Sequence, residues 1–355
     1  MTDSLSTQSL AEILKFASEA CASDVHLVTD APPMMRSHGE IARMPGAPFK
    51  PGEIKDLLKD IIAESLWQSF DQQERLCVSI YFEGIGYGRV TLYRSKGNVE
   101  AAIRLATSDI VSVSELGLPN FVNEMIDRKA GLILVTGATG MGKTTTLNTM
   151  INSINSTRRS KIVTLEDPIE YYHKHQRSIV VQQEMLTDFD DFNTGLVHVL
   201  RQDPDVIVVG EMRDLGTITT TLLAADTGHL VLATLHTQSA TGSVDRIVDA
   251  YPAQERNHIA AQLASSLVAV ISQLLVPTLD GRGRVLAYEI LIANQAVRNV
   301  IRDGKLQALD NILLTGTGEG MISMDRCLKN LYQRGVISYD TAINNARNPA
   351  GFRNA

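Results

Sequence analysis

The pattern of apolar and polar residues differs between the first hundred residues and the rest of the chain. In the first part, a helical repeat formed by Leu10, Ile13, Leu14 and Ala17 is mixed with short runs in which apolar and polar residues alternate. Strands are expected at residues 24–28, 78–82, 89–93 and 100–105, and a further helical pattern covers residues 53–70. A period of 3.6 residues indicates an amphipathic helix and alternation indicates a half-buried strand, so this part is predicted to be an α+β domain.

Beyond Gly131 the apolar residues come in short, continuous runs. These runs are residues 132–135, 162–165, 206–209 and 230–233, and each is separated from the next by a segment long enough for a helix. Uniformly apolar strands that alternate with helices are typical of a parallel sheet with both faces covered. After residue 253 the pattern becomes helical, and helices are expected over residues 255–275, 296–303 and 323–333.

Residues 257–279 contain no Asp, Glu, Lys or Arg, yet polar residues and a proline interrupt them. A membrane span needs about 20 predominantly apolar residues, so the pattern favours a buried helix instead.

The polar stretch at residues 107–120, which contains Gly and Pro, is expected to be a linker. The predicted organisation is therefore a small α+β domain over residues 1–106, the linker, and an α/β domain with a helical extension over residues 121–355. A chain of 355 residues is long enough for two such domains.

Charge and cysteine content exclude several classes of protein. Thirty-three basic against 40 acidic residues give a net charge of −7, which argues against binding nucleic acid through a broad basic surface. The N-terminus lacks the basic and apolar pattern of a signal peptide, so a cytoplasmic location is expected. Cys21, Cys77 and Cys327 are widely separated, which supports neither a disulfide framework nor a zinc site, and they are expected to be reduced and packed.

The most specific motif is a phosphate loop that directly follows the first apolar run. Residues 137–144 read GATGMGKT and match the pattern GxxxxGK[ST]. In such a loop the backbone N–H groups and the following helix N-terminus surround phosphate oxygens. Lys143 is expected to reach the β and γ phosphates, and the Thr144 hydroxyl is expected to ligate Mg²⁺. The candidate nucleotide-binding residues are Gly137, Ala138, Thr139, Gly140, Met141, Gly142, Lys143, Thr144 and Thr145.

Carboxylates follow two more of the apolar runs. Glu211 comes directly after residues 206–209, at the carboxyl end of a predicted buried strand, where ligands collect in open α/β sheets. There it could hold the metal ion or polarise the attacking water. Glu166 and Glu170 follow the run at 162–165, and either could be the general base. The sequence does not separate these two residues.

Two histidines flank the last apolar run. His229 precedes it and His236 follows it. A histidine beside an apolar strand is usually a structural, hydrogen-bonded residue. A pair at the edges of one strand of a nucleotide-binding domain could instead sense the γ phosphate.

The order of these segments resembles the secretion and type IV pilus motor ATPases. The phosphate loop, TLEDPIEY (164–171), LRQDPDVIVVGEMRD (200–214) and TGHLVLATLHTQSA (227–240) are similar to the Walker A motif, Asp box, Walker B motif and His box of that family. Residues 22–27 with the prolines at 32 and 33 resemble the start of the family's PAS-like N-terminal domain, and residues 272–275 resemble a later family helix. The loop has Ala138 and Met141 where the family commonly has Pro and Ser.

Two C-terminal segments point to one branch of the family. Residues 296–303 resemble the AIRNLIRE signature of the pilus retraction ATPases, the PilT group, and residues 320–325 are similar to a further segment of that group. Extension ATPases and type II secretion motors typically carry a tetracysteine zinc module, which a chain with three cysteines cannot build.

The resemblance implies a RecA-like P-loop ATPase with a PAS-like N-terminal domain. It further implies a ring, usually a hexamer, that hydrolyses ATP with Mg²⁺ and powers retraction of a type IV pilus. Its partner would be a pilus platform protein, reached from the cytoplasmic face of the inner membrane without insertion. Arg89 and Arg104 match arginines that the family directs at the nucleotide from the N-terminal domain, although both could equally be ordinary strand-edge charges.

Two other functions share part of this pattern. An accessory retraction ATPase or a type II secretion-type motor would have the same nucleotide motifs. A nucleotide-dependent scaffold with little turnover would need the phosphate loop but not Glu211 beside it.

Overall fold

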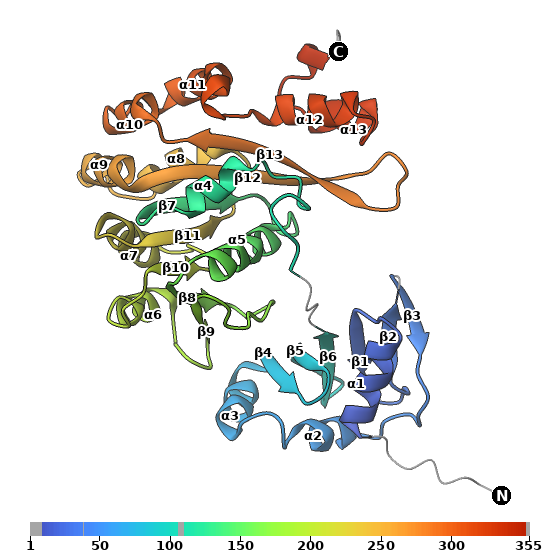
Figure 1. Ribbon diagram of the computed structural model, residues 1–355. Helices are drawn as coiled ribbons and strands as arrows, with labels where there is room; N and C mark the ends of the chain where they lie inside the picture. The colour runs from blue at the N-terminus through green and yellow to red at the C-terminus, as the bar shows by residue number, and fades with distance from the viewer. Residues whose placement is uncertain (1–8, 38, 106–109, 353–355) are drawn as a thin grey trace, which may run out of the picture. The chain divides into compact units, whose positions relative to one another are not determined.

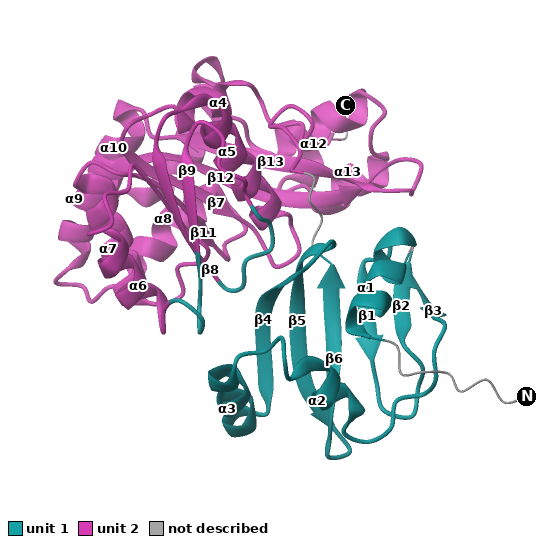
Figure 2. Cartoon of the chain, turned by 60° about the horizontal axis from the view of Figure 1, so that its bottom comes forward, with its two compact units in different colours: residues 1–109, 167–172, 183–188 teal, residues 110–166, 173–182, 189–355 magenta. Residues whose placement is uncertain are grey.

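The computed structural model describes residues 9–37, 39–105 and 110–352 (Figure 1). The chain forms two compact units, and Figure 2 colours them separately. The first comprises Met1–Asp109, Asp167–Tyr172 and Gln183–Asp188, and the second comprises Ile110–Glu166, His173–Gln182 and Phe189–Ala355. The domain limits expected at residues 106 and 121 stay a prediction, and residues 107–109 of the expected linker lie outside the described residues. No sequence pattern indicated that the two short segments Asp167–Tyr172 and Gln183–Asp188 would join the first unit.

The first unit is built on an antiparallel sheet with the strand order β3-β2-β1-β6-β5-β4. Its strands are β1 (Asp24–Leu27), β2 (Met34–Ser37), β3 (Glu40–Arg43), β4 (Arg75–Phe82), β5 (Gly86–Ser95) and β6 (Asn98–Leu105), and its helices are α1 (Leu10–Glu19), α2 (Glu53–Leu58) and α3 (Glu64–Gln73). Alternate residues of β1 and β5 are buried, as expected for a sheet with one packed face. The helical pattern expected over residues 53–70 is present as two helices, because the chain turns between α2 and α3 and places Ile62 in the core.

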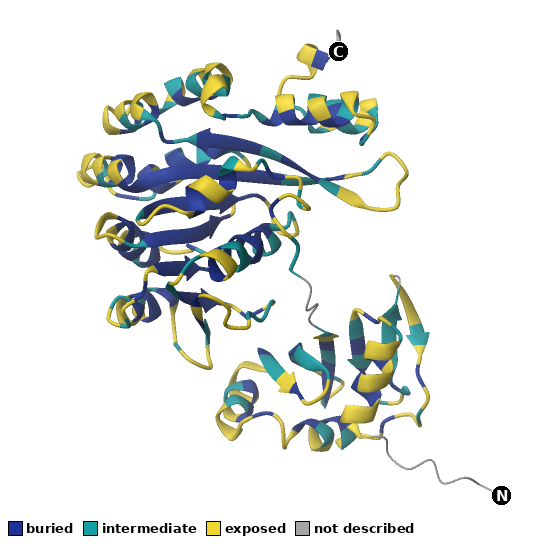
Figure 3. Ribbon diagram, viewed as in Figure 1, coloured by how far each residue is buried: buried dark blue, intermediate teal, exposed yellow. Residues whose placement is uncertain are grey.

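The second unit contains a seven-stranded sheet with the order β13-β12-β7-β11-β10-β8-β9. Its strands are β7 (Gly131–Thr136), β8 (Lys161–Glu166), β9 (Ile179–Glu184), β10 (Val206–Val209), β11 (Leu230–Leu235), β12 (Leu267–Pro277) and β13 (Arg284–Ile292). The strands β12, β7, β11, β10 and β8 run parallel, and β13 is antiparallel to β12. The four strands predicted from continuous apolar runs are confirmed. Every residue of β7, β10 and β11 is buried, which Figure 3 shows as dark strands inside exposed helices.

Helices cover both faces of this sheet. They are α4 (Phe121–Ile126), α5 (Lys143–Thr157), α6 (Phe192–Val199), α7 (Leu215–Asp226), α8 (Ala240–Asp249) and α9 (Arg256–Ser266). Ile133 and Val135 of β7 belong to one core cluster with α4 and α5, while the alternate residues Leu132 and Leu134 are equally buried. The predicted doubly covered α/β sheet is therefore confirmed.

One predicted helix is wrong in its second half. The pattern at residues 255–275 predicts a single helix, but α9 ends at Ser266 and Leu267–Pro277 is strand β12. Residues 272–275, which resemble a family helix, lie in this strand. The error has a physical cause: β12 is almost entirely buried, so its apolar run carries no period that distinguishes helix from strand.

The C-terminal part is helical, as predicted, after β13. It consists of α10 (Gln295–Arg302), η1 (Leu306–Ala308), α11 (Leu309–Thr315), η2 (Gly316–Glu319), α12 (Met324–Gln333), α13 (Tyr339–Asn345) and η3 (Pro349–Phe352). The predicted helices at 296–303 and 323–333 are confirmed by α10 and α12. A separate core cluster joins α12 and α13 to Val276 and Ala287 of the β12–β13 hairpin.

Within the described residues, no helix is long and apolar enough to cross a membrane. The three cysteines are free thiols. Cys327 is buried and Cys77 half-buried, but Cys21 is exposed, so the expectation that all three are packed is wrong for Cys21.

Candidate active site

The phosphate loop connects the carboxyl end of β7 to the start of α5. Its conformation requires glycine, because Gly137, Gly140 and Gly142 have φ values of 147°, 80° and 81°. A Cβ on Gly137 would also lie 2.7 Å from the carbonyl oxygen of Gln273. The N-terminus of α5 has no side-chain cap and no acidic residue in its first turn. In phosphate loops, the first N–H groups of the helix that follows the loop bind an anion.

Lys143 lies against the inside of this loop. Its side chain is 9% exposed, and Nζ donates hydrogen bonds to the carbonyl oxygens of Gly137 at 2.8 Å and Ala138 at 3.0 Å. Burial lowers the pKa of Lys143, and the negative charge of Glu211 opposes this shift. These hydrogen bonds go to neutral carbonyls, so the ammonium keeps its positive charge available for phosphate oxygens.

Glu211 and His236 meet beside the loop. Glu211 follows β10, His236 follows β11, and the two strands are parallel neighbours. His236 Nε2 lies 2.9 Å from Glu211 Oε1, and its Nδ1 lies 3.4 Å from Thr139 Oγ1 in the phosphate loop. Arg213 Nε contacts the other carboxylate oxygen of Glu211 at 2.7 Å. The carboxyl edge of the sheet thus holds a phosphate loop, a carboxylate and a histidine in contact through side chains.

The two candidate bases lie in different units. Glu166 ends β8 in the unit of the phosphate loop, is 7% exposed, and accepts hydrogen bonds from Thr164 Oγ1 at 2.7 Å and Gln182 Nε2 at 3.0 Å. Glu170 is exposed in the other unit and lies 3.7 Å from Arg89 Nη1. The structure therefore brings Glu166, and not Glu170, into the unit that carries Lys143 and Glu211.

His229 is not part of this cluster within the subunit. It precedes β11 whereas His236 follows it, and a strand of six residues spans about 20 Å. His229 N–H and Nδ1 both contact the carbonyl oxygen of Ala224 in the last turn of α7, at 3.2 and 3.0 Å. Of the expected pair, His236 alone contacts the phosphate loop among the described residues, whereas His229 closes a helix end at the opposite edge of the sheet. A response of both histidines to the γ phosphate stays a prediction.

The two candidate arginines of the first unit stand directly opposite each other. The register of β5 and β6 pairs Arg89 with Arg104. Like charges in this position repel, and each arginine has its own acidic neighbour. Arg104 Nε lies 3.0 Å from Asp24 Oδ1, while Arg89 pairs with Glu170 and its Nε donates to Cys77 Sγ at 3.1 Å. The Arg104 side chain is 66% exposed despite this ion pair.

Strand β12 contributes residues that the sequence did not assign to the site. Leu275 N–H donates to Met141 Sδ at 3.4 Å, and Gln273 Nε2 donates to Thr146 Oγ1 of α5 at 2.7 Å. Gln273 is 3% exposed. Met141, where the family commonly has Ser, thus fastens the loop to β12. The family resemblance had singled out residues 272–275. Because they were predicted to be helical, their contacts with the phosphate loop and α5 were not expected.

His173 supports α5 from a loop for which no role was predicted. Its Nε2 lies 2.7 Å from Asn148 Oδ1, and Asn148 Nδ2 donates to the carbonyl of Thr144. Burial lowers the pKa of His173 to about 4, so this ring is neutral near pH 7. The contact is therefore a neutral hydrogen bond that braces the first turns of α5.

The donor set fits Mg²⁺ bound together with a nucleotide. Mg²⁺ usually takes one or two protein ligands and completes its shell with phosphate oxygens and water. Among the described residues, no group of three or more His, Cys, Asp and Glu side chains could hold a metal ion alone. Thr144 in the first turn of α5 and Glu211 are the residues whose hydroxyl and carboxylate oxygens could hold such a shared ion.

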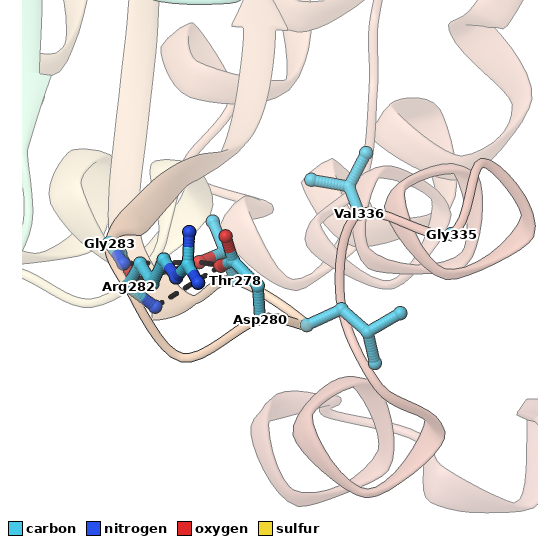
Figure 4. A pocket seen from close by; sticks show the side chains of 7 residues that line it. Thr278, Asp280, Arg282, Gly283, Gly335 and Val336 are labelled. Carbon is cyan, nitrogen blue, oxygen red and sulfur yellow. Dashed lines mark hydrogen bonds between the residues drawn. The ribbon is translucent and has the colours of Figure 1, made fainter.

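A surface pocket of 610 Å³ lies at the tip of the β12–β13 hairpin, against Gly335 and Val336 (Figure 4). Its polar groups are bonded within the turn: Arg282 N–H donates to Asp280 Oδ1 at 3.1 Å, and Gly283 N–H donates to Thr278 Oγ1 at 3.2 Å. Leu279 N–H donates to the carbonyl of Val336 at 2.8 Å. Because these polar groups bond to one another, the pocket follows from the folding of the hairpin end, and we assign it no ligand.

A parallel α/β sheet with a complete phosphate loop at its carboxyl edge defines a P-loop nucleotide-binding protein. Comparison with known proteins specifies the family. Residues 91–313 match the family model described as type II/IV secretion system protein. The chain belongs to this family and, within it, to the PilT group of type IV pilus retraction ATPases.

The individual relatives support this placement. The type IV pilus retraction ATPase PilT of Pseudomonas aeruginosa is 39% identical over 97% of this chain and 99% of its own length. A twitching motility protein of Neisseria gonorrhoeae is 40% identical over 89% of this chain and 84% of its own length. A crystal structure of the pilus retraction motor PilT with bound ADP superposes with a TM-score of 0.91, at 41% identity, over 98% of this chain and all of that one.

Proposed function

We propose that this chain is an ATP-hydrolysing motor subunit that powers retraction of a type IV pilus. The observation that carries the proposal is the contact of Glu211 and His236 with each other and with Thr139 of the phosphate loop. A binding loop alone would suit a scaffold, whereas a carboxylate and a histidine at the loop provide groups that hydrolysis needs. Family membership then connects hydrolysis to pilus retraction.

The proposed roles follow from position and chemistry. The loop N–H groups and Lys143 bind the phosphates and oppose the charge that develops during phosphoryl transfer. Thr144 and Glu211 would hold Mg²⁺, which supplies charge neutralisation at the phosphates when bound. His236 responds to the γ phosphate through its contacts with Thr139 and Glu211.

Glu166 is the favoured general base of the two candidates. Its carboxylate ends a buried strand at the edge that carries Glu211, and Thr164 and Gln182 fix its orientation. A base must be held within hydrogen-bond reach of the water it activates, and such fixed orientation serves that purpose. Glu170 keeps the alternative role of pairing with Arg89.

The working assembly is proposed to be a ring, a hexamer as the family resemblance implies. Nucleotide would bind more tightly to closed than to open subunits, and this difference in affinity would supply the work. Arg89 and Arg104 would approach the nucleotide on closure. The ring would act on a pilus platform protein from the cytoplasmic face of the inner membrane, bound there without insertion.

A deletion strain tests the proposal. We expect loss of twitching motility together with an increased number of surface pili, because pilins would no longer be removed. The parent gene should restore both traits, and a gene encoding Glu211→Gln should restore neither. Normal twitching and normal pilus number in the deletion strain would instead assign the chain to an accessory or secretion motor. Absence of phosphate release from purified, assembled protein would assign it to a scaffold.

A further inference from the structure

A charged pair outside the nucleotide site connects the C-terminal segment with the middle of the sheet. Glu289 lies on β13 and Arg347 follows α13, and the Glu289 side chain is 1% exposed. The guanidinium contacts both carboxylate oxygens, with Nη2 2.9 Å from Oε1 and Nη1 2.9 Å from Oε2. Two parallel charge-assisted hydrogen bonds fix both distance and orientation. A buried carboxylate held in this way constrains every element that it contacts.

Glu289 also holds the first residues of two helices. Its Oε1 accepts a hydrogen bond from the Ala240 N–H of α8 at 2.8 Å, and its Oε2 lies 3.4 Å from the Met324 N–H of α12. A negative charge is favourable at a helix N-terminus because the first N–H groups lack partners within the helix. Helices α8 and α12 therefore begin at the same carboxylate.

Arg347 reaches the histidine loop directly. Its Nη2 donates to the carbonyl oxygen of Gln238 at 3.2 Å, two residues after His236. Its backbone is fixed in turn by α12, since Asp325 accepts hydrogen bonds from the N–H groups of Arg347 at 2.7 Å and Asn348 at 2.9 Å. A continuous set of hydrogen bonds thus runs from α12 to the loop that carries His236.

The same loop is tied to the strand that precedes the phosphate loop. Glu289 pairs with Ser272 across β13 and β12, and Ser272 pairs with Thr136, the last residue of β7. Ser243 of α8 contacts Thr136 Oγ1 at 3.3 Å and Thr237 Oγ1 at 2.6 Å. A shift of the start of α8 would therefore move His236 relative to the phosphate loop.

We propose that Arg347, acting through Glu289 and the carbonyl of Gln238, positions the imidazole of His236 for ATP hydrolysis. The C-terminal segment would then help to set the turnover rate, although neither Arg347 nor Glu289 belongs to the nucleotide motifs. Both are positioning residues. The inference rests on the function proposed above for His236.

The test measures kcat and KM for ATP on the full-length protein, with ring assembly and thermal unfolding followed in parallel. Arg347→Ala is expected to lower kcat by about tenfold while KM changes by less than about threefold, because a displaced group costs rate more than ground-state binding. Arg326→Ala is the matched control. Arg326 lies exposed on α12, and its side chain makes no hydrogen bond or ion pair with the described residues, so its kcat should equal that of the parent.

A double-mutant cycle with His236→Ala separates positioning from general structural support. If Arg347 acts through His236, adding Arg347→Ala to His236→Ala should lower kcat by less than about twofold. The proposal would be overturned if Arg347→Ala lowered kcat by the same factor with and without His236. It would also be overturned by an unchanged kcat in folded Arg347→Ala, or by a loss of kcat that failed ring assembly explains. Arg347→Lys provides the same test if the alanine variant does not fold, because a lysine cannot bridge Glu289 and Gln238 with a planar fork. A His236→Ala variant with parental kcat would instead overturn the role proposed for His236 itself.

Discussion

The two edges of the parallel sheet use the same residue types for different purposes. At the amino edge, cationic and imidazole side chains bond to backbone carbonyls: His229 to Ala224, and Arg158 to Ile126 and Arg128 at 2.9 and 3.1 Å. At the carboxyl edge, His236 bonds to the Glu211 carboxylate and approaches Thr139. Of the two histidines, the one that bonds to a carbonyl closes a helix end, whereas the one that bonds to a side chain remains able to exchange that partner for a ligand. For this pair, the hydrogen-bond partner, more than the residue type, distinguishes a structural role from the proposed chemical role.

The largest effect on turnover is expected at the carboxyl edge from Glu211→Gln. The amide keeps the volume of the side chain but removes its charge, so kcat should fall by about 10³-fold while ATP binding changes little. Phosphate release and binding of a fluorescent ATP analogue measure the two properties separately. Glu124→Gln, an exposed change on α4, is the control and should leave both unaltered. Hydrolysis by Glu211→Gln at the parental rate would show that the metal site has been assigned wrongly.

The two histidines test the comparison directly, because they lie at opposite ends of β11. His236→Ala should lower kcat by about 10²-fold and change stability little, since it removes a group from the proposed site. His229→Ala should keep kcat within about twofold and lower the free energy of unfolding by about 1 kcal/mol, because Ala224 loses a hydrogen bond at the end of α7. Steady-state kinetics and denaturant unfolding of both variants provide the measurement. A loss of turnover in His229→Ala with intact rings would place that residue in the site through a neighbouring subunit.

Most of the sheet and the phosphate loop could be predicted because their signals are local. The strands β7, β8, β10 and β11 are continuous apolar runs, and the loop motif needs only eight residues in sequence. The boundary between α9 and β12 had no such signal: Ser266 and Leu267 stand together without an intervening Gly or Pro, and both sides are buried. Without β12, the contacts of Met141 and Gln273 could not be foreseen.

Other features depend on contacts between distant segments. Glu184 and Ile169 join the first unit through Ser79, whose N–H donates to Glu184 Oε1 at 2.7 Å and whose Oγ donates to the carbonyl of Ile169 at 2.8 Å. No periodicity in either segment predicts these bonds. By contrast, the separation of His229 from His236 was available from the length of the strand between them. Whether both histidines respond to the γ phosphate stays a prediction.

A smaller effect is expected from Arg104, which we propose to approach the nucleotide when the ring closes. Arg104→Ala should lower kcat by about tenfold, less than the loss of a sole transition-state arginine, because Arg89 stands opposite it and can substitute in part. The activity per subunit of the parent should also rise with protein concentration as rings assemble. Arg94→Ala on β5, which removes a guanidinium paired with Asp71 at 2.7 Å, is the matched control and should retain the parental rate. If the activity per subunit does not change with protein concentration or with Arg104→Ala, Arg104 only forms an ion pair with Asp24.

The smallest effect on turnover is expected at the amino edge from the signature helix α10. Arg298 bonds to backbone there, as His229 does: its guanidinium donates to the carbonyls of Ser265 and Leu267 at 2.7 Å each, and also to that of Ala264. Its Nε donates to the carbonyl of Ala293 at 2.9 Å, so one side chain closes the end of α9, the start of β12 and the end of β13. Burial and the charges of Arg128 and Arg302 lower the pKa of Arg298, but an arginine remains protonated throughout the physiological range.

Arg298→Ala should therefore lower the free energy of unfolding by roughly 2–3 kcal/mol, because it leaves several carbonyls without a donor. The rate of hydrolysis per assembled ring should stay within about twofold of the parent, since the nucleotide motifs lie at the other edge of the sheet. Twitching should nevertheless be lost, as the resemblance of residues 296–303 to the retraction signature implies. Asn299→Ala on the exposed side of α10 separates the two contributions, because it changes the signature without removing the bonds of Arg298. If both variants lose twitching but keep hydrolysis, the surface of α10 couples hydrolysis to retraction. If only Arg298→Ala loses twitching, and its stability is reduced, the signature instead supports α9 and β12.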